Sequence, residues 1–399
     1  MDQSFFHEIV WSRFIRFPYG HLLDYAGENG EAIYPTKDEC EKSMPNPRSW
    51  GLPIADCAFF TGLYVYALLE EYRKHRSPKT AEEIDILIKG LYLLQDVAKV
   101  EGFIARGVGE DGRSHYPMGA ECQNFPWILA LYSYYKSDLC TDHAGVKERL
   151  LRVLLALRKY EWNIPCDVEG VFYNKSSSWL KRNDWRGVVM LLFCTRLIYE
   201  LTENKEALDL FQEYMSSVPT AGVFKRKEIV SQGYSHDMVT SFGNQTWICL
   251  YTHLAVKELL KLDPNHEAEY KLCLYTNGVT ALKNINSIKK YDNGVGGFDI
   301  NWRSLNALWK DYENDTSTGT AIAEKQSSYW RENLVPHREM EHSVLGNALF
   351  AAWVAVTSED ERISKKAMEI FKEEITRINW NSLHLSYAFV AESVLIFGE

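Results

Sequence analysis

The sequence predicts an all-α protein, and within that class an (α/α)6 toroid, with six buried helices inside six amphipathic ones. Segments that are apolar nearly all round alternate with segments that are apolar on one face only. The pair recurs at intervals of roughly 60–70 residues, which is typical of helical repeat architectures. Short connections follow each buried segment and long loops precede it, so the buried helices should all begin on the same side of the molecule.

The first half of the chain opens with an amphipathic helix, because Phe6, Ile9 and Phe14 recur at helical spacing. A long loop with many Pro and Gly residues leads to the first buried helix. The spacing of Thr80 and Glu83 predicts a capping pair at the start of the next amphipathic helix. The amphipathic helices expected in this half cover 3–16, 81–99 and 144–160, and the buried helices cover 54–75 and 120–136.

The second half repeats the same alternation, and its longest loop runs from about 285 to 339. Helix 3–16 should be the outer partner of the last buried helix and close the ring. No strand-rich segment marks a second unit, so we expect one domain over residues 1–399. The buried helices expected here cover 184–202, 241–261, 340–356 and 382–397, and the amphipathic helices cover 204–216, 265–284 and 360–377.

Composition and charge exclude several classes of protein. The 399 residues carry a net charge of −10, whereas general nucleic-acid binding needs a basic surface. No apolar run reaches membrane-spanning length, and the N-terminal segment lacks the basic start and apolar run of a signal peptide. The eight cysteines include no CxxC pair and are typical of reduced thiols. We therefore expect a cytoplasmic protein that binds neither nucleic acid nor membrane, and we leave its oligomeric state open.

The polar residues of the buried helices gather in their first turns, where all six long loops should open into one funnel. Since burying polar groups costs free energy, this clustering favours a wet or ligand-filled mouth over core packing. The alternative for any single acid is helix capping, which favours acids in a first turn. The residues concerned are Asp56, Glu121, Gln123, Asn124, Asp184, Arg186, Asn244, Gln245, Glu341, His342 and His384.

Tryptophan is unusually frequent in the loops, which carry or border eight of the twelve. Large amphipathic rings in loops can stack on ligands, and sugar faces are common partners. The alternative is that the long loops fold back and need aromatic cores of their own. The tryptophans concerned are Trp50, Trp162, Trp179, Trp185, Trp302, Trp309, Trp330 and Trp380, and Tyr116 reinforces the pattern.

Two arginines, Arg106 and Arg186, could clamp a carboxylate or an acidic sugar, because guanidinium offers a fork of donors. The alternative for each is that it ties down loop carbonyls. The histidines show neither HExxH nor another metal spacing, and a metal held by His337 and His342 is a minor alternative. We expect neither a metal nor a cofactor.

Three stretches resemble the six-hairpin glycosidase superfamily: W-x5-D-x2-FF-x-GLY-x2-ALLEEY over 50–72, GFIARGV over 102–108, and HYPMGAECQNFPWILALYSYY over 115–135. They look like the first two hairpins of bacterial unsaturated glucuronyl and rhamnogalacturonyl hydrolases. The resemblance implies that acids near the starts of inner helices perform the chemistry, and Asp56 and Glu121 occupy the matching positions. The sequence departs from the family pattern at the second of these acids, which is a glutamate, Glu121, within GAECQ. N-acylglucosamine 2-epimerases share the toroid and use paired histidines, which His236 or His342 with His384 could mimic.

Glycoside cleavage needs one protonated and one ionised carboxyl group. We expect the catalytic pair to come from Asp56, Glu121, Asp184 and Glu341, and we favour the first two because their hairpins are adjacent. The expected partner is an oligosaccharide. The alternatives are a sugar epimerase or polysaccharide lyase with a His or Tyr base, and a non-catalytic glycan-binding protein. Residues expected to contact the sugar are Trp50, Arg106, His115, Tyr116, Gln123, Trp185, Arg186, His236, Gln245, Trp302, His342 and His384.

Overall fold

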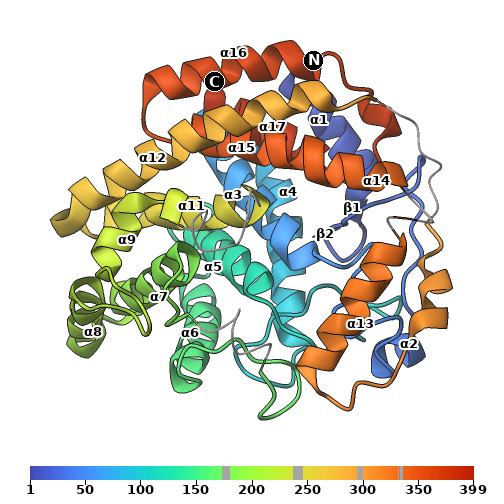
Figure 1. Ribbon diagram of the computed structural model, residues 1–399, viewed down its shortest axis with the longest axis horizontal. Coiled ribbons are helices and arrows are strands. Elements are labelled where there is room, and N and C mark those ends of the chain that lie inside the picture. The colour runs from blue at the N-terminus through green and yellow to red at the C-terminus, as the bar shows by residue number, and fades with distance from the viewer. Residues whose placement is uncertain (173–179, 237–245, 294–299, 331, 333–335) are drawn as a thin grey trace.

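The computed structural model describes residues 1–172, 180–236, 246–293, 300–330, 332 and 336–399. Within these residues the protein is all-α, as predicted (Figure 1). The strands found in this part of the chain are two short ones, β1 (Ile15–Arg16) and β2 (His21–Leu22), which pair antiparallel. None of its helices is long and apolar enough to span a bilayer.

The buried helices predicted from all-round apolarity are present and contact one another. Every residue of α15 after its first is buried, and α3 is buried from its start through Leu69. Helix α3 packs against α5 and α17, while α11 packs against α7 and α15, and α15 packs against α17. These helices are α3 (Cys57–His75), α5 (Glu121–Tyr135), α7 (Trp185–Thr202), α11 (Thr246–Leu262), α15 (Asn347–Val356) and α17 (Ala388–Gly398).

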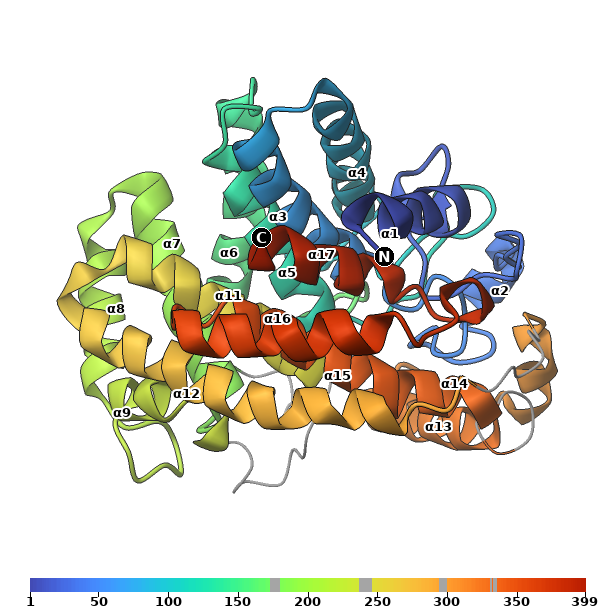
Figure 2. The same ribbon diagram turned by 90° about the horizontal axis from the view of Figure 1, so that it is seen from above.

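The amphipathic helices are present too, and they bury one face only. In α16, for example, Ile363, Ala367 and Phe371 form the buried stripe. Helix α4 packs on α3, α12 on α11 and α15, and α1 on α17, so the two ends of the chain lie close together (Figure 2). These helices are α1 (Gln3–Ile9), α4 (Pro78–Asp96), α6 (His143–Lys159), α8 (Lys205–Ser216), α12 (Glu267–Ile285) and α16 (Glu361–Ile375).

Helices α3 and α5 approach each other closely because Gly62 has no side chain. A β-carbon at this position would lie 2.6 Å from both the carbonyl carbon and the oxygen of Pro126. Glycine inside a helix costs about 1 kcal/mol relative to alanine, so its presence here is explained by packing rather than by helix propensity. The close approach fixes the starts of both helices relative to each other.

The structure corrects several predicted boundaries. Helix α4 begins at Pro78 rather than at 81, and Ser77 caps it in place of the predicted pair of Thr80 and Glu83. The last buried helix begins at Ala388 rather than at 382, and His384 therefore lies in the irregular segment before it. That segment pairs with the N-terminal loop through a bridge between Tyr25 and Leu385. The N-terminal helix ends in a π-helical turn, Val10–Phe14. The long loops also contain helices that periodicity did not indicate, namely α2 (Lys37–Glu41), α9 (Arg226–Gln232), α13 (Thr316–Tyr329) and α14 (Pro336–Met340).

Two of the long loops, 17–53 and 300–330, supply most of a small second apolar core, in which Trp302 and Trp330 are buried. Arg303 donates to both carboxylate oxygens of Glu39, at 2.7 and 2.9 Å, and the side chains of Asn46 and Gln326 are hydrogen-bonded at 2.7 Å. The loops therefore form a fixed wall, seen around α2 and α13 in Figure 1.

Candidate functional site

A cavity of about 360 Å³ lies at the N-terminal end of α3. Its wall comes from the starts of buried helices, from α14, from the segment before α17 and from the two loops that share the small core. The charged residues that line it are Asp24, Arg48, Asp56, Arg106, Arg338 and Glu339. The aromatic residues are Trp50, Phe59, Phe60, Trp247, Trp330, Phe350 and Tyr387, and His342 and Cys122 also face it.

Asp56 directly precedes α3, but its side chain makes no capping hydrogen bond to the helix. Instead, Oδ1 accepts hydrogen bonds from Nη1 of Arg106, at 2.9 Å, and from Nε2 of Gln123, at 2.5 Å. Among the described residues, no donor reaches Oδ2. The side chain is 25% exposed. The contacts on Oδ1 are of the kind that an ionised carboxylate accepts, and Oδ2 is open to a ligand.

Arg106 is itself buried, and it fastens the loop GFIARGV to the start of α3. Its Nη1 also donates to the carbonyl of Ala55 at 2.9 Å, and its own carbonyl accepts from the N–H of Ala58 at 3.0 Å. One of the N–H groups that a helix start leaves unpaired is thereby satisfied by loop backbone. Arg106 thus clamps a carboxylate of the protein and also ties down a loop carbonyl.

Asp24 contributes a second carboxyl group to the cavity. Its backbone N–H donates to the carbonyl of Pro53 at 2.8 Å, and its carbonyl accepts from the N–H of Ser386 at 3.1 Å. The side chain is 11% exposed, and its nearest cation is Nη2 of Arg338, at 3.6 Å. Burial raises the pKa of Asp24 well above its ordinary value, and the charge of Asp56 raises it further, while Arg338 and Arg106 act in the opposite direction.

Two arginines of the cavity wall lie over aromatic rings. The guanidinium of Arg338 lies 4.3 Å from the ring centroid of Tyr25 and 5.5 Å from that of Trp330. That of Arg48 lies 3.8 Å from the ring centroid of Trp50. Cation–π contacts of this kind hold a guanidinium in place against the face of the ring.

His342 and Tyr387 form a hydrogen-bonded pair in the same wall, with 2.8 Å between Nδ1 and the phenol oxygen. His342 lies in a π-helical turn, Glu341–Gly346. A β-carbon at Gly346 would come within 2.9 Å of the phenol oxygen of Tyr387, so this glycine makes room for the ring. Burial raises the pKa of Tyr387 well above its ordinary value, so the phenol keeps its proton and can donate it to Nδ1.

The other three acids expected at the site are engaged in contacts within the protein. Glu121 accepts from Arg182, at 2.8 Å, and pairs with Arg186, at 3.1 Å. Asp184 caps α7 through the N–H of Gly187 and also pairs with Arg182, so capping explains its position. None of the three belongs to the residues that line the cavity.

Glu341, the third of these acids, holds the segment before α17 in place. Its Oε2 accepts from the backbone N–H groups of His384 and Leu385, at 2.9 and 2.8 Å. The side chain is only 2% exposed. Glu341 therefore positions the chain that carries Tyr387 and does not itself face the cavity.

The residues expected to contact a sugar divide into three groups. Trp50, Arg106 and His342 line the cavity, and Gln123 reaches it through Asp56. Gln245, together with Asn244 and Trp179, lies outside the described residues. The remaining residues contact other parts of the protein. The hydrogen-bonded ones are His115 with Asp167, Tyr116 with the carbonyl of Met44, His236 with Gln232, and Trp302 with the carbonyl of Ile33. Arg186 forms an ion pair with Glu121, His384 stacks on Tyr25, and Trp185 is buried in the core.

The loop tryptophans divide in the same way. Trp50 and Trp330 line the cavity, whereas Trp162, Trp302 and Trp380 are wholly buried. For these last three, an aromatic core within the loops is the better explanation. Asp24 and Arg338 carried no sequence signal, because neither lies in a motif or at the start of a predicted helix.

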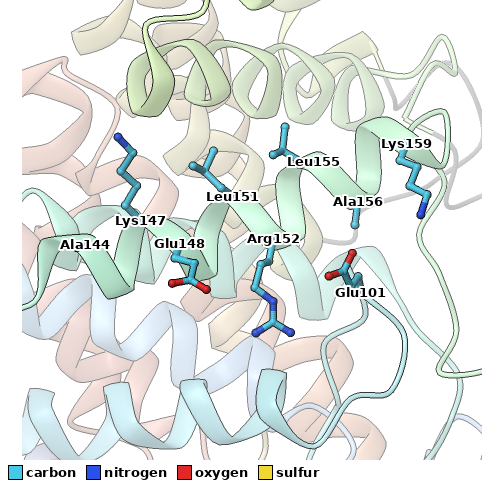
Figure 3. A pocket seen from close by; sticks show the side chains of 9 residues that line it. All are labelled: Glu101, Ala144, Lys147, Glu148, Leu151, Arg152, Leu155, Ala156 and Lys159. Carbon is cyan, nitrogen blue, oxygen red and sulfur yellow. The ribbon is translucent and has the colours of Figure 1, made fainter.

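A shallower groove of about 620 Å³ follows the outer face of α6 (Figure 3). It is lined by one helix and Glu101, and its charged side chains point in different directions (Figure 3). Convergent polar groups, which mark a ligand site, are missing from this lining. No group of three or more His, Cys, Asp or Glu residues in the described ranges is arranged to hold a metal ion.

The chain gives no significant match to protein-family models, to curated proteins or to solved structures.

Proposed function

We propose that this protein is a carbohydrate-active enzyme, a glycoside hydrolase that acts on an oligosaccharide inside the cavity at the start of α3. The observation that carries the proposal is the geometry of Asp56. Two donors hold its Oδ1, its Oδ2 is open, and aromatic rings surround it. An oriented carboxylate beside flat apolar surfaces suits a sugar ring, which presents an apolar face and polar edges.

The proposed fold is the (α/α)6 toroid of the six-hairpin glycosidase superfamily. Its support is the neighbour order of the buried helices, since α3 contacts both α5 and α17, and α11 contacts both α7 and α15. Each amphipathic helix contacts a buried one, and α1 packs on α17 as the closing pair would. Fold alone does not decide the reaction.

The substrate we propose is a short, acidic oligosaccharide. A volume of about 360 Å³ is at the lower end of what ligand pockets offer, roughly 300–1,000 Å³, so the cavity suits the end of a chain better than its middle. Arg48 and Arg338 lie against rings in its wall, and guanidinium groups recognise carboxylates.

The test is a product assay on purified protein with a panel of neutral and acidic oligosaccharides, including unsaturated uronides, followed by mass spectrometry. Hydrolysis yields two fragments whose combined mass exceeds the substrate by one water. The Asp56→Asn variant should lose this activity while keeping its fold. Two fragments formed with equal yield by the variant would refute the proposal.

A second candidate function is epimerisation or lyase chemistry, which the His342–Tyr387 pair favours because a histidine or tyrosine can serve as the base. Epimerisation leaves the mass unchanged and alters the chromatographic retention, and a lyase yields fragments without added water. This candidate would be favoured if the His342→Gln variant lost the epimerase or lyase activity and the Asp56→Asn variant retained it. Sugar binding without any product would favour a non-catalytic glycan-binding protein.

A further inference from the structure

The two carboxyl groups in the cavity have opposite surroundings. Asp56 is partly exposed, and two donors contact one of its oxygens. Asp24 is more deeply buried, and its closest cation lies at 3.6 Å, which is beyond hydrogen-bonding distance. Pairs of carboxyl groups whose surroundings favour opposite protonation states are how enzymes assign acid and base roles.

Building on the proposed function, we infer that Asp24 is the general acid that protonates the leaving group, with Asp56 as its ionised partner. Both line the same cavity. The backbone N–H of Asp24 donates to the carbonyl of Pro53, three residues before Asp56, and this hydrogen bond holds the two segments together. The raised pKa of Asp24, caused first by burial and then by the charge of Asp56, supports the assignment.

Glu339 also lines the cavity, and it is the alternative candidate for the general acid. It lies on α14 and is half-buried, whereas Asp24 is buried and fixed by backbone hydrogen bonds on both sides. A general acid has to keep its proton near neutral pH, which requires a shielded site. The structure therefore favours Asp24.

In the reaction, the bond between the anomeric carbon and the leaving oxygen breaks as that oxygen takes the proton of Asp24. The anomeric carbon bonds either to a water oxygen, whose proton Asp56 accepts, or to Oδ2 of Asp56. In the second case a later water displaces Asp56 and returns a proton to Asp24. Either route consumes one water for each bond cleaved.

The deciding experiment compares substrates with poor and good leaving groups, namely an alkyl and a 2,4-dinitrophenyl glycoside of the same sugar. Asp24→Asn should lower kcat/KM on the alkyl glycoside by ~10²–10⁴-fold, the usual size of a general-acid contribution. On the activated glycoside, whose leaving group needs no proton, the loss should stay below about tenfold. Equal losses on both substrates, or the same leaving-group dependence in Glu339→Gln instead, would overturn the assignment.

The exposed Asp85 on α4 offers a matched control, because Asp85→Asn removes one carboxylate that does not line the cavity. This variant should match the wild type on both substrates. If the wild type cleaves no glycoside at all, the proposed function fails, whereas an active enzyme without leaving-group dependence in Asp24→Asn refutes only this inference.

A second measurement needs no variant. In the wild type, kcat/KM on the alkyl glycoside should fall as the pH rises through the raised pKa of Asp24, because the acid loses its proton. A rate that does not fall as the pH rises above neutral would overturn the assignment. Neighbouring ionisable groups also affect how kcat/KM falls with pH. Those around Asp24 are Asp56, Arg106, Arg338, Glu339 and Tyr387.

Discussion

Nη1 of Arg106 donates a hydrogen bond of 2.9 Å to Oδ1 of Asp56, the residue directly before α3. The same guanidinium nitrogen holds the carbonyl of Ala55, while the carbonyl of Arg106 accepts the N–H of Ala58. Backbone from the 101–119 loop therefore satisfies a helix N–H that a capping side chain would otherwise bind. Asp56 makes no capping bond, and its carboxylate faces the cavity instead.

Replacing Asp56 by asparagine should abolish turnover and leave the protein folded. The amide oxygen still accepts from Arg106 and Gln123, and no capping bond is lost. We expect kcat to fall at least ~10²-fold, as for other acid–base residues, with circular dichroism unchanged. A variant that is folded and fully active would rule out a catalytic role.

Replacing Glu121 by glutamine should instead destabilise the fold. The change leaves the buried guanidinium groups of Arg182 and Arg186 without their shared carboxylate, and breaking such a buried ion pair costs about 3–5 kcal/mol. Denaturant unfolding measures this loss. Glu148 on the exposed face of α6 is the control, and Glu148→Gln should stay within about 0.5 kcal/mol of wild type. A stable but inactive Glu121→Gln would return this residue to the catalytic pair.

The Gly62→Ala substitution tests the close approach of α3 and α5. Alanine is the better helix former by about 1 kcal/mol, so an unconstrained position would become more stable. Here the added methyl would meet the backbone of Pro126 at 2.6 Å, and overpacking of this kind typically costs about 1–3 kcal/mol. We expect a lower melting temperature, and an increase would contradict the packing described.

Stability should depend on pH through His7, whose two ring nitrogens each lie 3.0 Å from a glutamate oxygen, Nε2 from Glu83 and Nδ1 from Glu392. Burial opposes the charge of His7, but the two carboxylates outweigh it and raise the pKa from 6.5 to about 9. Because the folded pKa lies above the unfolded one, this stabilisation is complete below pH 6.5 and is lost as the pH rises toward 9.

With allowance for solvent screening, the contribution of His7 is on the order of 2 kcal/mol. Thermal unfolding between pH 6 and 10 would measure it. The wild type should lose stability over this range more steeply than His7→Gln, which lacks the titrating group. Parallel pH profiles for the two proteins would show that the ion pairs between α1, α4 and α17 contribute nothing.

Much of the helical framework could be predicted because its cause is local. All-round apolarity at 57–75 and a single apolar stripe at 361–375 are properties of consecutive residues, and the structure has helices at both. The start of the last helix was misplaced, since residues 382–387 are held out of it by distant partners, Tyr25 and Glu341. Contacts between residues so distant in the sequence cannot be predicted from the local spacing of apolar residues.

The sequence by itself determined the buried and amphipathic helices, the all-α class and the position of Asp56 at a helix start, because helical periodicity is encoded within a few residues. Only the tertiary structure decided which acids face a cavity. Glu121 is neutralised by arginines 61 and 65 positions further along, whereas Asp24 meets Arg338 from the opposite end of the chain. Whether a carboxylate is paired or exposed depends on residues far away in sequence, and the fold alone brings these together.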